Sequence, residues 1–203
     1  MFRSLFMGLW FFGLVAGAGA PVLAEDSPTA VVERLHATLL DNMKNGKALG
    51  FEGRRAKLDP VVKEAFDLES MTRISTGAGW QKMPQTDQAN VIKAFSDWTV
   101  ASYAGNFDDF SGETFTTKDT SKEDAKGNVM VNTRLDPKGI PPVLLNYRLH
   151  KVNGAWKIFD IYLDGAISQL AMRRAEFSAV LARGTPADLV THMNKLTEDA
   201  KKG

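Results

Sequence analysis

Histidine, cysteine and closely spaced carboxylates build most catalytic and metal sites, and this sequence offers few arrangements of them. The three histidines, His36, His150 and His192, lie far apart, and no two of them are at metal-ligand spacing. The chain contains no cysteine, which excludes disulfides and thiolate metal sites. We therefore expect neither a metal ion nor a cofactor, and we expect each histidine to lie at the surface or to form a structural hydrogen bond.

Sequence motifs for catalysis and nucleotide binding give no better support for chemistry. The sequence contains no Gly-x-Ser-x-Gly elbow, no phosphate loop and no Gly-x-Gly-x-x-Gly turn after a strand. The partly acidic stretch 119–128 lacks the alternating carboxylates of a calcium loop. No residue is predicted to be catalytic from a motif.

Asp160 is the carboxylate with the most unusual surroundings, because it lies in the apolar run 156–163. A carboxylate in apolar surroundings needs a partner, or its pKa rises. One hypothesis makes Asp160 a general base at the bottom of a pocket. The other makes it a structural acid that is paired with Arg148, Arg173 or a backbone N–H group.

The adjacent pair Arg173-Arg174 lies in a predicted helix and has two interpretations. Either arginine can contact an anionic headgroup. Alternatively, one arginine is solvated and the other forms an ion pair with a neighbouring carboxylate.

The first 24 residues have the order of a secretory signal peptide: Arg3 near the start, an apolar stretch over residues 5–18, and the small residue Ala24 at the end. We predict cleavage after Ala24 and one exported domain over residues 25–203. Without Arg3 this domain has 24 basic and 24 acidic residues, since the whole chain has 25 and 24. Such a balance gives no support for nucleic-acid binding, which normally requires a basic excess.

Helical periodicity fills the first half of this domain and its C-terminal end. The clearest helix begins at Thr86-Asp87 and ends near Gly105, with an apolar face opposite charged residues. The other predicted helices, which have capping residues or apolar spacing of their own, cover about 27–46, 51–66 with an interruption at Asp59-Pro60, 67–76, 166–181 and 185–200.

From residue 113 the pattern changes to the alternation of a β-sheet. Val143, Leu145 and Tyr147 share one face of a strand. Asn153-Gly154 is a strong hairpin signal that leads into residues 156–163, and this run is apolar on both faces, as is typical of a central strand. Helices and an antiparallel sheet in separate runs predict an α+β fold.

Large apolar and aromatic side chains are numerous in both the sheet and the helices. Packing into a core explains most of them. A sheet covered by helices can also enclose a ligand cavity where the layers separate, and the lining of that cavity would have the same composition. Composition alone leaves both possibilities open.

A family resemblance is carried by four stretches of the last third, residues 141–147, 156–161, 164–168 and 177–181. In order and spacing they resemble the MlaC family of periplasmic phospholipid-binding proteins, also called toluene-tolerance auxiliary proteins. Residues 67–80 and 86–103 are similar to the central helices of that family. The sequence over residues 162–177 is closer to HpnM, the hopanoid-associated branch.

The resemblance implies an NTF2-like antiparallel sheet flanked by helices, with an apolar cavity between the layers that holds lipid tails. It implies a soluble periplasmic carrier without an enzymatic step, which exchanges a phospholipid or a hopanoid with membrane-embedded lipid-transport complexes. We expect a monomer that binds no nucleic acid. The residues carried over as lipid-binding lie on sheet and helix faces and are Ile74, Phe95, Trp98, Tyr103, Val129, Val131, Val143, Leu145, Tyr147, Ile161 and Phe177.

Two other functions remain open at this point. One is an NTF2-like enzyme that acts on a small apolar substrate with Asp160 as general base. The other is an adaptor that docks to a membrane transport complex without binding lipid. Lipid bound to protein purified without detergent would favour the carrier over both.

Overall fold

The computed structural model describes residues 26–202. Its helices are α1 (Pro28–Lys44), α2 (Gly46–Ala65), α3 (Leu68–Thr76), the 3₁₀ helix η1 (Gly77–Lys82), α4 (Gln85–Asn106), α5 (Gln169–Arg183) and α6 (Pro186–Lys202). Its strands are β1 (Thr114–Thr120), β2 (Val129–Asp136), β3 (Val143–Val152), β4 (Ala155–Leu163) and β5 (Ile167–Ser168). Over this range, no helix has both the length and the apolar character that a bilayer-spanning segment needs. The predicted signal peptide, residues 1–24, and its cleavage after Ala24 lie outside the described residues.

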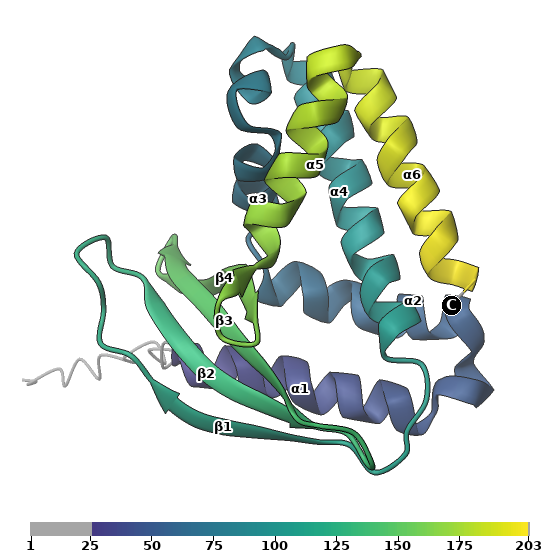
Figure 1. Ribbon diagram of the computed structural model, residues 1–203, viewed down its shortest axis with the longest axis vertical. Helices are drawn as coiled ribbons and strands as arrows, with labels where there is room; N and C mark the ends of the chain where they lie inside the picture. The colour runs from purple at the N-terminus through teal and green to yellow at the C-terminus, as the bar shows by residue number, and fades with distance from the viewer. Residues whose placement is uncertain (1–25, 203) are drawn as a thin grey trace, which may run out of the picture.

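The strands form one antiparallel sheet in the order β1-β2-β3-β4-β5, so that each strand lies beside its neighbour in the chain. Asn153 and Gly154 form the turn between β3 and β4, and their φ values of 51° and 86° are typical of a type I′ hairpin. Helices precede and follow the sheet instead of alternating with its strands (Figure 1). The predicted α+β fold is therefore confirmed.

Helix α1 covers part of one face of the sheet, and α4, α5 and α6 rise away from it (Figure 1). Val32, Leu35 and Leu39 are fully buried on α1. Their spacing of three and four residues places them on one helix face. Burying a side chain of this size stabilises the fold by about 1.5–3 kcal/mol, so this face anchors α1 against the sheet and α2.

Two helix boundaries differ from the prediction. α2 runs through Pro60 and is broken instead at Gly50, whose φ of 60° and ψ of 177° are not helical. Pro60 and Ala56, whose carbonyl loses its helical partner to the proline, are both exposed, so water can satisfy that carbonyl. α5 begins at Gln169, later than predicted, because Ile167–Ser168 first pairs with β4 as strand β5.

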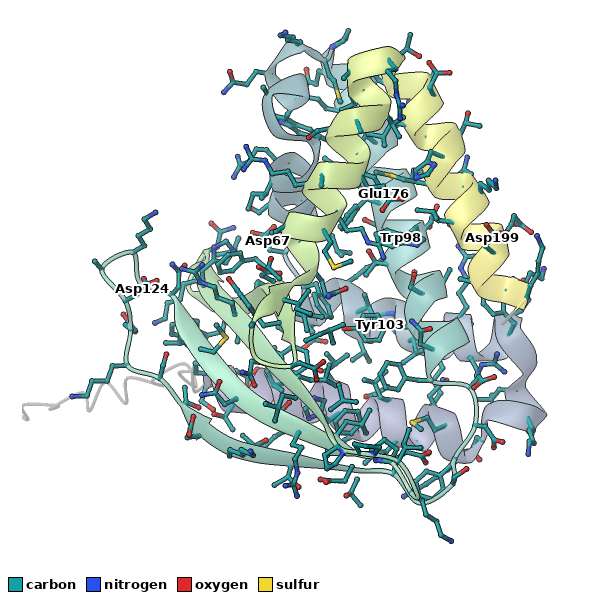
Figure 2. The ribbon with its side chains drawn as sticks, viewed as in Figure 1. Asp67, Trp98, Tyr103, Asp124, Glu176 and Asp199 are labelled. Atoms are coloured by element: carbon teal, nitrogen blue, oxygen red, sulfur yellow. The ribbon has the colours of Figure 1, made fainter. Side chains whose placement is uncertain are left out.

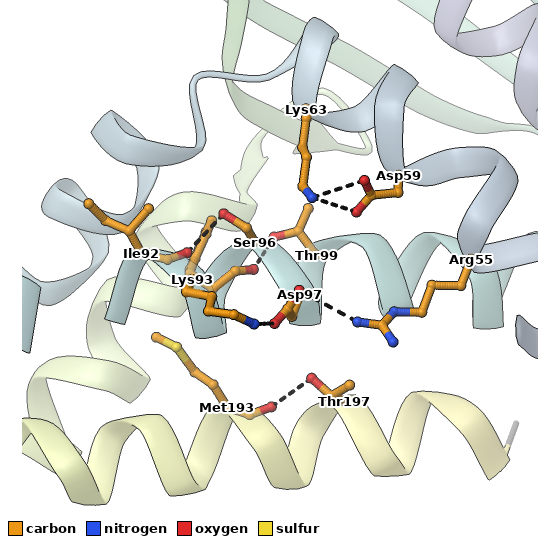
Figure 3. Close-up of polar contacts among 11 residues, drawn as sticks. Arg55, Asp59, Lys63, Ile92, Lys93, Ser96, Asp97, Thr99, Met193 and Thr197 are labelled. Carbon is orange, nitrogen blue, oxygen red and sulfur yellow. Dashed lines mark hydrogen bonds and ion pairs between the residues drawn. The ribbon is translucent and has the colours of Figure 1, made fainter. Parts of the chain in front are cut away.

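The Lys93–Asp97 pair of helix α4 lies on the side of that helix that faces α6, and Asp97 also approaches Arg55 of α2 (Figure 3). Asp97 accepts a hydrogen bond of 2.6 Å from Nζ of Lys93, one turn earlier, and lies 3.5 Å from Nη2 of Arg55 on α2. Asp59 and Lys63 form a similar pair within α2. Partly exposed pairs of this kind contribute about 0–1 kcal/mol each. The buried side of α4 therefore determines its orientation more than these ion pairs do.

A buried hydrogen bond links α1 to the sheet. Nε2 of His36 lies 3.0 Å from the hydroxyl of Tyr147 on β3, and the imidazole stacks on the ring of Phe115 with 4.0 Å between centroids. His36 is 4% exposed and Tyr147 is 1% exposed. Burial lowers the pKa of His36 from 6.5 to about 4, so the imidazole is neutral at pH 7.

We expect His36 to make the fold less stable as the pH decreases from about 6.5 to 4. The unfolded chain takes up a proton at the ordinary pKa of 6.5, whereas the folded chain takes it up only at about 4. The contribution of His36 to the free energy of unfolding is therefore complete above pH 6.5 and is lost toward pH 4. It amounts to something on the order of 3 kcal/mol. Denaturant unfolding across this pH range should show that the free energy of unfolding depends less on pH in His36→Gln than in wild type.

Tyr147→Phe is the control for this prediction, because it removes the hydrogen bond and leaves the buried imidazole. It should be less stable at every pH and should keep the pH dependence of the wild type. Equal slopes of stability against pH in wild type and His36→Gln would contradict the assignment.

Candidate functional site

A pocket of about 300 Å³ lies between α4, the sheet and the start of α5. Figure 2 shows Trp98 and Tyr103 on the side of α4 that faces this space. The volume is at the lower end of the range for ligand pockets, roughly 300–1,000 Å³. Most of the lining is apolar, and its residues are Phe66, Met71, Phe95, Trp98, Thr99, Ser102, Tyr103, Asn106, Phe107, Leu145, Tyr147, Asp160, Ile161, Leu163, Gln169, Leu170 and Arg173.

One face of α4 supplies a continuous wall. Phe95, Trp98 and Ser102 recur at intervals of three and four residues, so they lie on one stripe of the helix, with Tyr103 beside them. Phe95 and Trp98 also pack edge-on against Phe177 of α5, with 6.3 and 5.9 Å between ring centroids. α5 therefore packs against the N-terminal part of the stripe, and Ser102 and Tyr103 extend the wall beyond it.

Strands β3 and β4 supply the opposite wall. Their antiparallel register places Leu145 beside Leu163 and Tyr147 beside Ile161, so these side chains share one face of the sheet. Burial raises the pKa of Tyr147. The pKa of Tyr103 is raised by burial first and then by the repulsion that its phenolate would meet from a phenolate at Tyr147. Both phenols are neutral at pH 7, and a ligand in the pocket meets an uncharged surface here.

Asp160 on β4 is 5% exposed and holds the start of α5. Its Oδ2 accepts a hydrogen bond of 2.6 Å from the Ser168 hydroxyl. Its Oδ1 accepts hydrogen bonds from the backbone N–H groups of Leu170, at 3.0 Å, and Ile161, at 2.8 Å. Ser168 is the N-cap of α5 and accepts from the N–H of Ala171 at 3.0 Å. The carboxylate therefore lies at a helix N-terminus, where the helix dipole favours negative charge.

The prediction of an arginine partner for Asp160 is wrong, and that of a backbone N–H partner is confirmed. Nη2 of Arg148 instead donates to Asp124 at 2.9 Å, and Nη1 of Arg173 donates to Glu176 at 2.6 Å. The N–H groups of Leu170, in the first turn of α5, and of Ile161, on β4, take the place of the arginines. These contacts occupy both oxygens of Asp160 and leave the general-base hypothesis without support.

Arg173 on α5 is the cationic residue of the pocket lining, and its side chain is 32% exposed. Its guanidinium carbon is 4.6 Å from the centre of the Trp98 ring. Glu176 accepts from Arg173 and also lies 2.7 Å from Nε2 of His192 on α6. Burial would raise the pKa of Glu176, but the hydrogen bonds with His192 and Arg173 outweigh burial and lower it. Glu176 is thus an anion that holds Arg173 over Trp98.

The predicted structural hydrogen bonds of the histidines are confirmed. Besides the two contacts described above, Nε2 of His150 lies 2.8 Å from Oδ2 of Asp67, the N-cap of α3. Within residues 26–202, no three His, Cys, Asp or Glu side chains are grouped as they would be around a metal ion.

A larger hollow, of about 400 Å³, lies between α4 and α6. Its lining includes Asp87, Lys93, Asp97 and Asn194. Charged side chains on one wall make this hollow unsuitable for an apolar ligand. The pocket beside the sheet is therefore the better candidate for a functional site.

Comparison with known proteins identifies the family. A family model described as MlaC protein matches residues 33–195. The chain belongs to the MlaC family. Among curated proteins, none matches this sequence.

A solved structure resembles this member of the MlaC family over nearly its whole described length. It is a phospholipid-binding protein from Ralstonia solanacearum in complex with a phospholipid, determined at 1.53 Å resolution. The two structures align with a TM-score of 0.75 and 21% sequence identity, and the alignment covers 86% of this chain and 99% of the other. At this level of identity, the likeness shows that the two proteins share a fold.

Six of the eleven residues that the MlaC resemblance assigned to lipid binding come together around the pocket, namely Phe95, Trp98, Tyr103, Leu145, Tyr147 and Ile161. Val129, Val131 and Phe177 are buried in the core outside its lining. Ile74 and Val143 are partly buried and also lie outside it. Ile74 lines a separate hollow with Phe159.

Several apolar residues of the pocket were not predicted from the sequence: Phe66, Met71, Phe107, Leu163 and Leu170. Strand periodicity could have predicted Leu163, because it lies two residues after Ile161 on β4 and faces the same side of the sheet. Phe66 and Phe107 follow the ends of α2 and α4, where helical periodicity stops. For these two residues the local pattern contains no signal.

We expect Asp160→Asn to lower the free energy of unfolding by about 1–3 kcal/mol, because it removes a charged acceptor from the start of α5. Chemical denaturation measures this loss. Asp164→Asn is the matched control: Asp164 is an exposed turn residue with a φ of 49°, a conformation that asparagine tolerates equally well. Unchanged stability in Asp160→Asn, or an equal loss in both variants, would contradict the capping role.

Proposed function

We propose that this protein is a soluble lipid carrier of the periplasm that holds lipid tails in the pocket between α4 and the sheet. The observation that carries the proposal is an apolar pocket at a place where the layers of an α+β fold separate. Membership of the MlaC family supports it. The phospholipid bound by the Ralstonia protein, which shares the fold, supports it further.

The proposed lipid-contacting residues are those that the pocket brings together. Tyr103 of α4, Leu145 of β3 and Leu170 of α5 are three of them, from three different elements. The carried-over residues outside the lining, which include Val131 and Phe177, act through packing behind the walls. The residues that line the pocket are thus proposed to contact the lipid, and the core residues behind them to hold the walls in place through packing.

A phospholipid is the first candidate ligand, and a hopanoid, which the likeness to the HpnM branch suggests, is the second. Each exposed CH₂ group of a lipid tail costs about 0.8 kcal/mol in water. A carrier removes most of this cost during transit and must release the lipid at its destination. Since a pocket of about 300 Å³ holds only part of a two-chain lipid, its walls must move apart to accept a whole phospholipid.

The proposed partners are membrane-embedded lipid-transport complexes, which load and unload a monomeric carrier. The enzyme hypothesis has less support, because Asp160 is used at the start of α5. An adaptor that binds no lipid would have no use for an apolar pocket. Both alternatives predict that altering the pocket has no effect on bound lipid.

Leu145→Trp tests the carrier function directly. Overpacking a filled core typically costs about 1–3 kcal/mol, but a tryptophan at position 145 can extend into the pocket that Leu145 lines. We expect the variant to remain folded with a smaller loss and to contain much less lipid than wild type. Mass spectrometry of protein purified without detergent measures the lipid, and denaturant unfolding measures the stability.

Leu149→Trp is the matched control on the same strand. Leu149 faces the same side of β3 but is fully buried and outside the pocket lining. This variant should lose more stability than Leu145→Trp. A folded Leu145→Trp protein with the lipid content of wild type would place lipid binding elsewhere.

The periplasmic part of the proposal predicts a processed N-terminus. The sequence over residues 1–24 has signal-peptide order, so the protein isolated from its native host should begin at Glu25. Intact-mass measurement of the periplasmic fraction tests this. Protein that retains Met1 and sediments with the inner membrane would contradict export as a soluble carrier.

A further inference from the structure

Arg173 is the cationic residue of the pocket lining, and its side chain is 32% exposed, so it is in contact with both the pocket and solvent. We propose that Arg173 binds the phosphate of a lipid headgroup, so that the pocket selects phosphate-bearing lipids over neutral ones. The proposal rests on the lipid-carrier function and adds the chemical class of the ligand to it.

The geometry of Arg173 suits this role. The guanidinium lies over the Trp98 ring at 4.6 Å, which fixes its plane, and only Nη1 has a described acceptor, Glu176 at 2.6 Å. A guanidinium has five N–H donors in a rigid fork. Among residues 26–202, no further acceptor is described for Nε or Nη2 of Arg173, and its side chain is 32% exposed. Donors are therefore left for two oxygens of a phosphodiester.

The lining of the pocket contains polar residues besides Arg173. Gln169 on the same helix and Asn106 at the end of α4 also line the pocket and can bond ester or glycerol oxygens. Leu163 and Tyr147 form the apolar wall on the sheet. The lining thus offers apolar surface to lipid tails and polar groups to a headgroup.

The charges near Arg173 do not prevent it from binding an anion. Asp160 is the other charged residue of the lining, and both of its oxygens are occupied by donors from Ser168, Leu170 and Ile161. Glu176 takes one end of the guanidinium and is itself held by His192. Glu176 is therefore a positioning residue that keeps the rest of the fork available.

Lipid uptake from mixed vesicles tests the proposal. The vesicles contain equal amounts of phosphatidylglycerol and diacylglycerol with the same acyl chains, so the two lipids differ in the headgroup alone. After incubation and separation from the vesicles, mass spectrometry gives the ratio of the two lipids in the protein. We expect this ratio to fall by about tenfold to a hundredfold in Arg173→Met relative to wild type, because charged hydrogen bonds are lost while the apolar stem is kept.

Two further variants control for charge and for folding. Arg174→Met removes the same charge from the adjacent position, where the side chain approaches Gly77 at the end of α3 instead of the pocket, and it should keep the wild-type ratio. Arg173→Lys keeps the charge but not the planar fork, and it should retain part of the preference. It also provides a folded comparison if Arg173→Met is unstable.

The outcomes separate this proposal from the carrier function. Equal ratios in wild type, Arg173→Met and Arg173→Lys would overturn the role of Arg173 and leave the carrier intact, whereas uptake of neither lipid by wild type would contradict the carrier itself. Excess inorganic phosphate is the last arm of the test. We expect it to lower the wild-type ratio toward that of Arg173→Met, because free phosphate and the headgroup compete for one guanidinium. Wild type that binds inorganic phosphate but takes up both lipids equally would show a site for free phosphate, and the assignment to a lipid headgroup would be wrong.

Discussion

The hydrogen-bonded carboxylate of Asp160 is the interaction on which the pocket depends. It connects β4 to the first turn of α5 and so fixes the point and the direction in which that helix leaves the sheet. Within that turn Leu170 becomes part of the pocket wall, and Arg173, one turn further, also lines the pocket. A buried carboxylate is tolerated here because three donors and a helix N-terminus meet it.

Helix α5 has a second attachment two turns beyond the first. Phe177 is fully buried and packs edge-on against Phe95 and Trp98 of α4. The pocket lies against the stretch of α5 between this aromatic contact and the Asp160 contact. The two attachments thus hold α5 across the sheet and α4 without filling the space between them, which is how a well-packed fold retains an apolar cavity.

The parts of the fold that depend on near neighbours in sequence could be predicted, and the parts that depend on distant contacts could not. The stripe on α4 and the alternation on β3 follow from spacings of two to four residues, and both are present. The partners of Asp160 required knowledge of where α5 begins, which β-pairing of Ile167–Ser168 decides.

The same limit separates the pocket from the core. Val131 and Leu145 face the same side of the sheet, since Val131 pairs with Tyr147 on β3. Only Leu145 lines the pocket, because α1 packs against β1 and β2. The alternation along a strand predicts which side of the sheet a residue faces, but not which helix covers that residue. Residues of one face can therefore belong either to the core or to the ligand site, and the local sequence does not distinguish the two.

The ionisable groups around the pocket favour binding over turnover. His36 is neutral and bonded to Tyr147, both tyrosines of the lining have raised pKa values, and the carboxylate of Asp160 is occupied by donors. A general acid or base must instead be free to exchange a proton with its substrate near neutral pH. Arg173, the cationic residue of the lining, is paired with Glu176 and is 32% exposed. The ionisable groups of the lining thus serve as structural partners, and the apolar wall between them is the surface that the fold offers to a ligand.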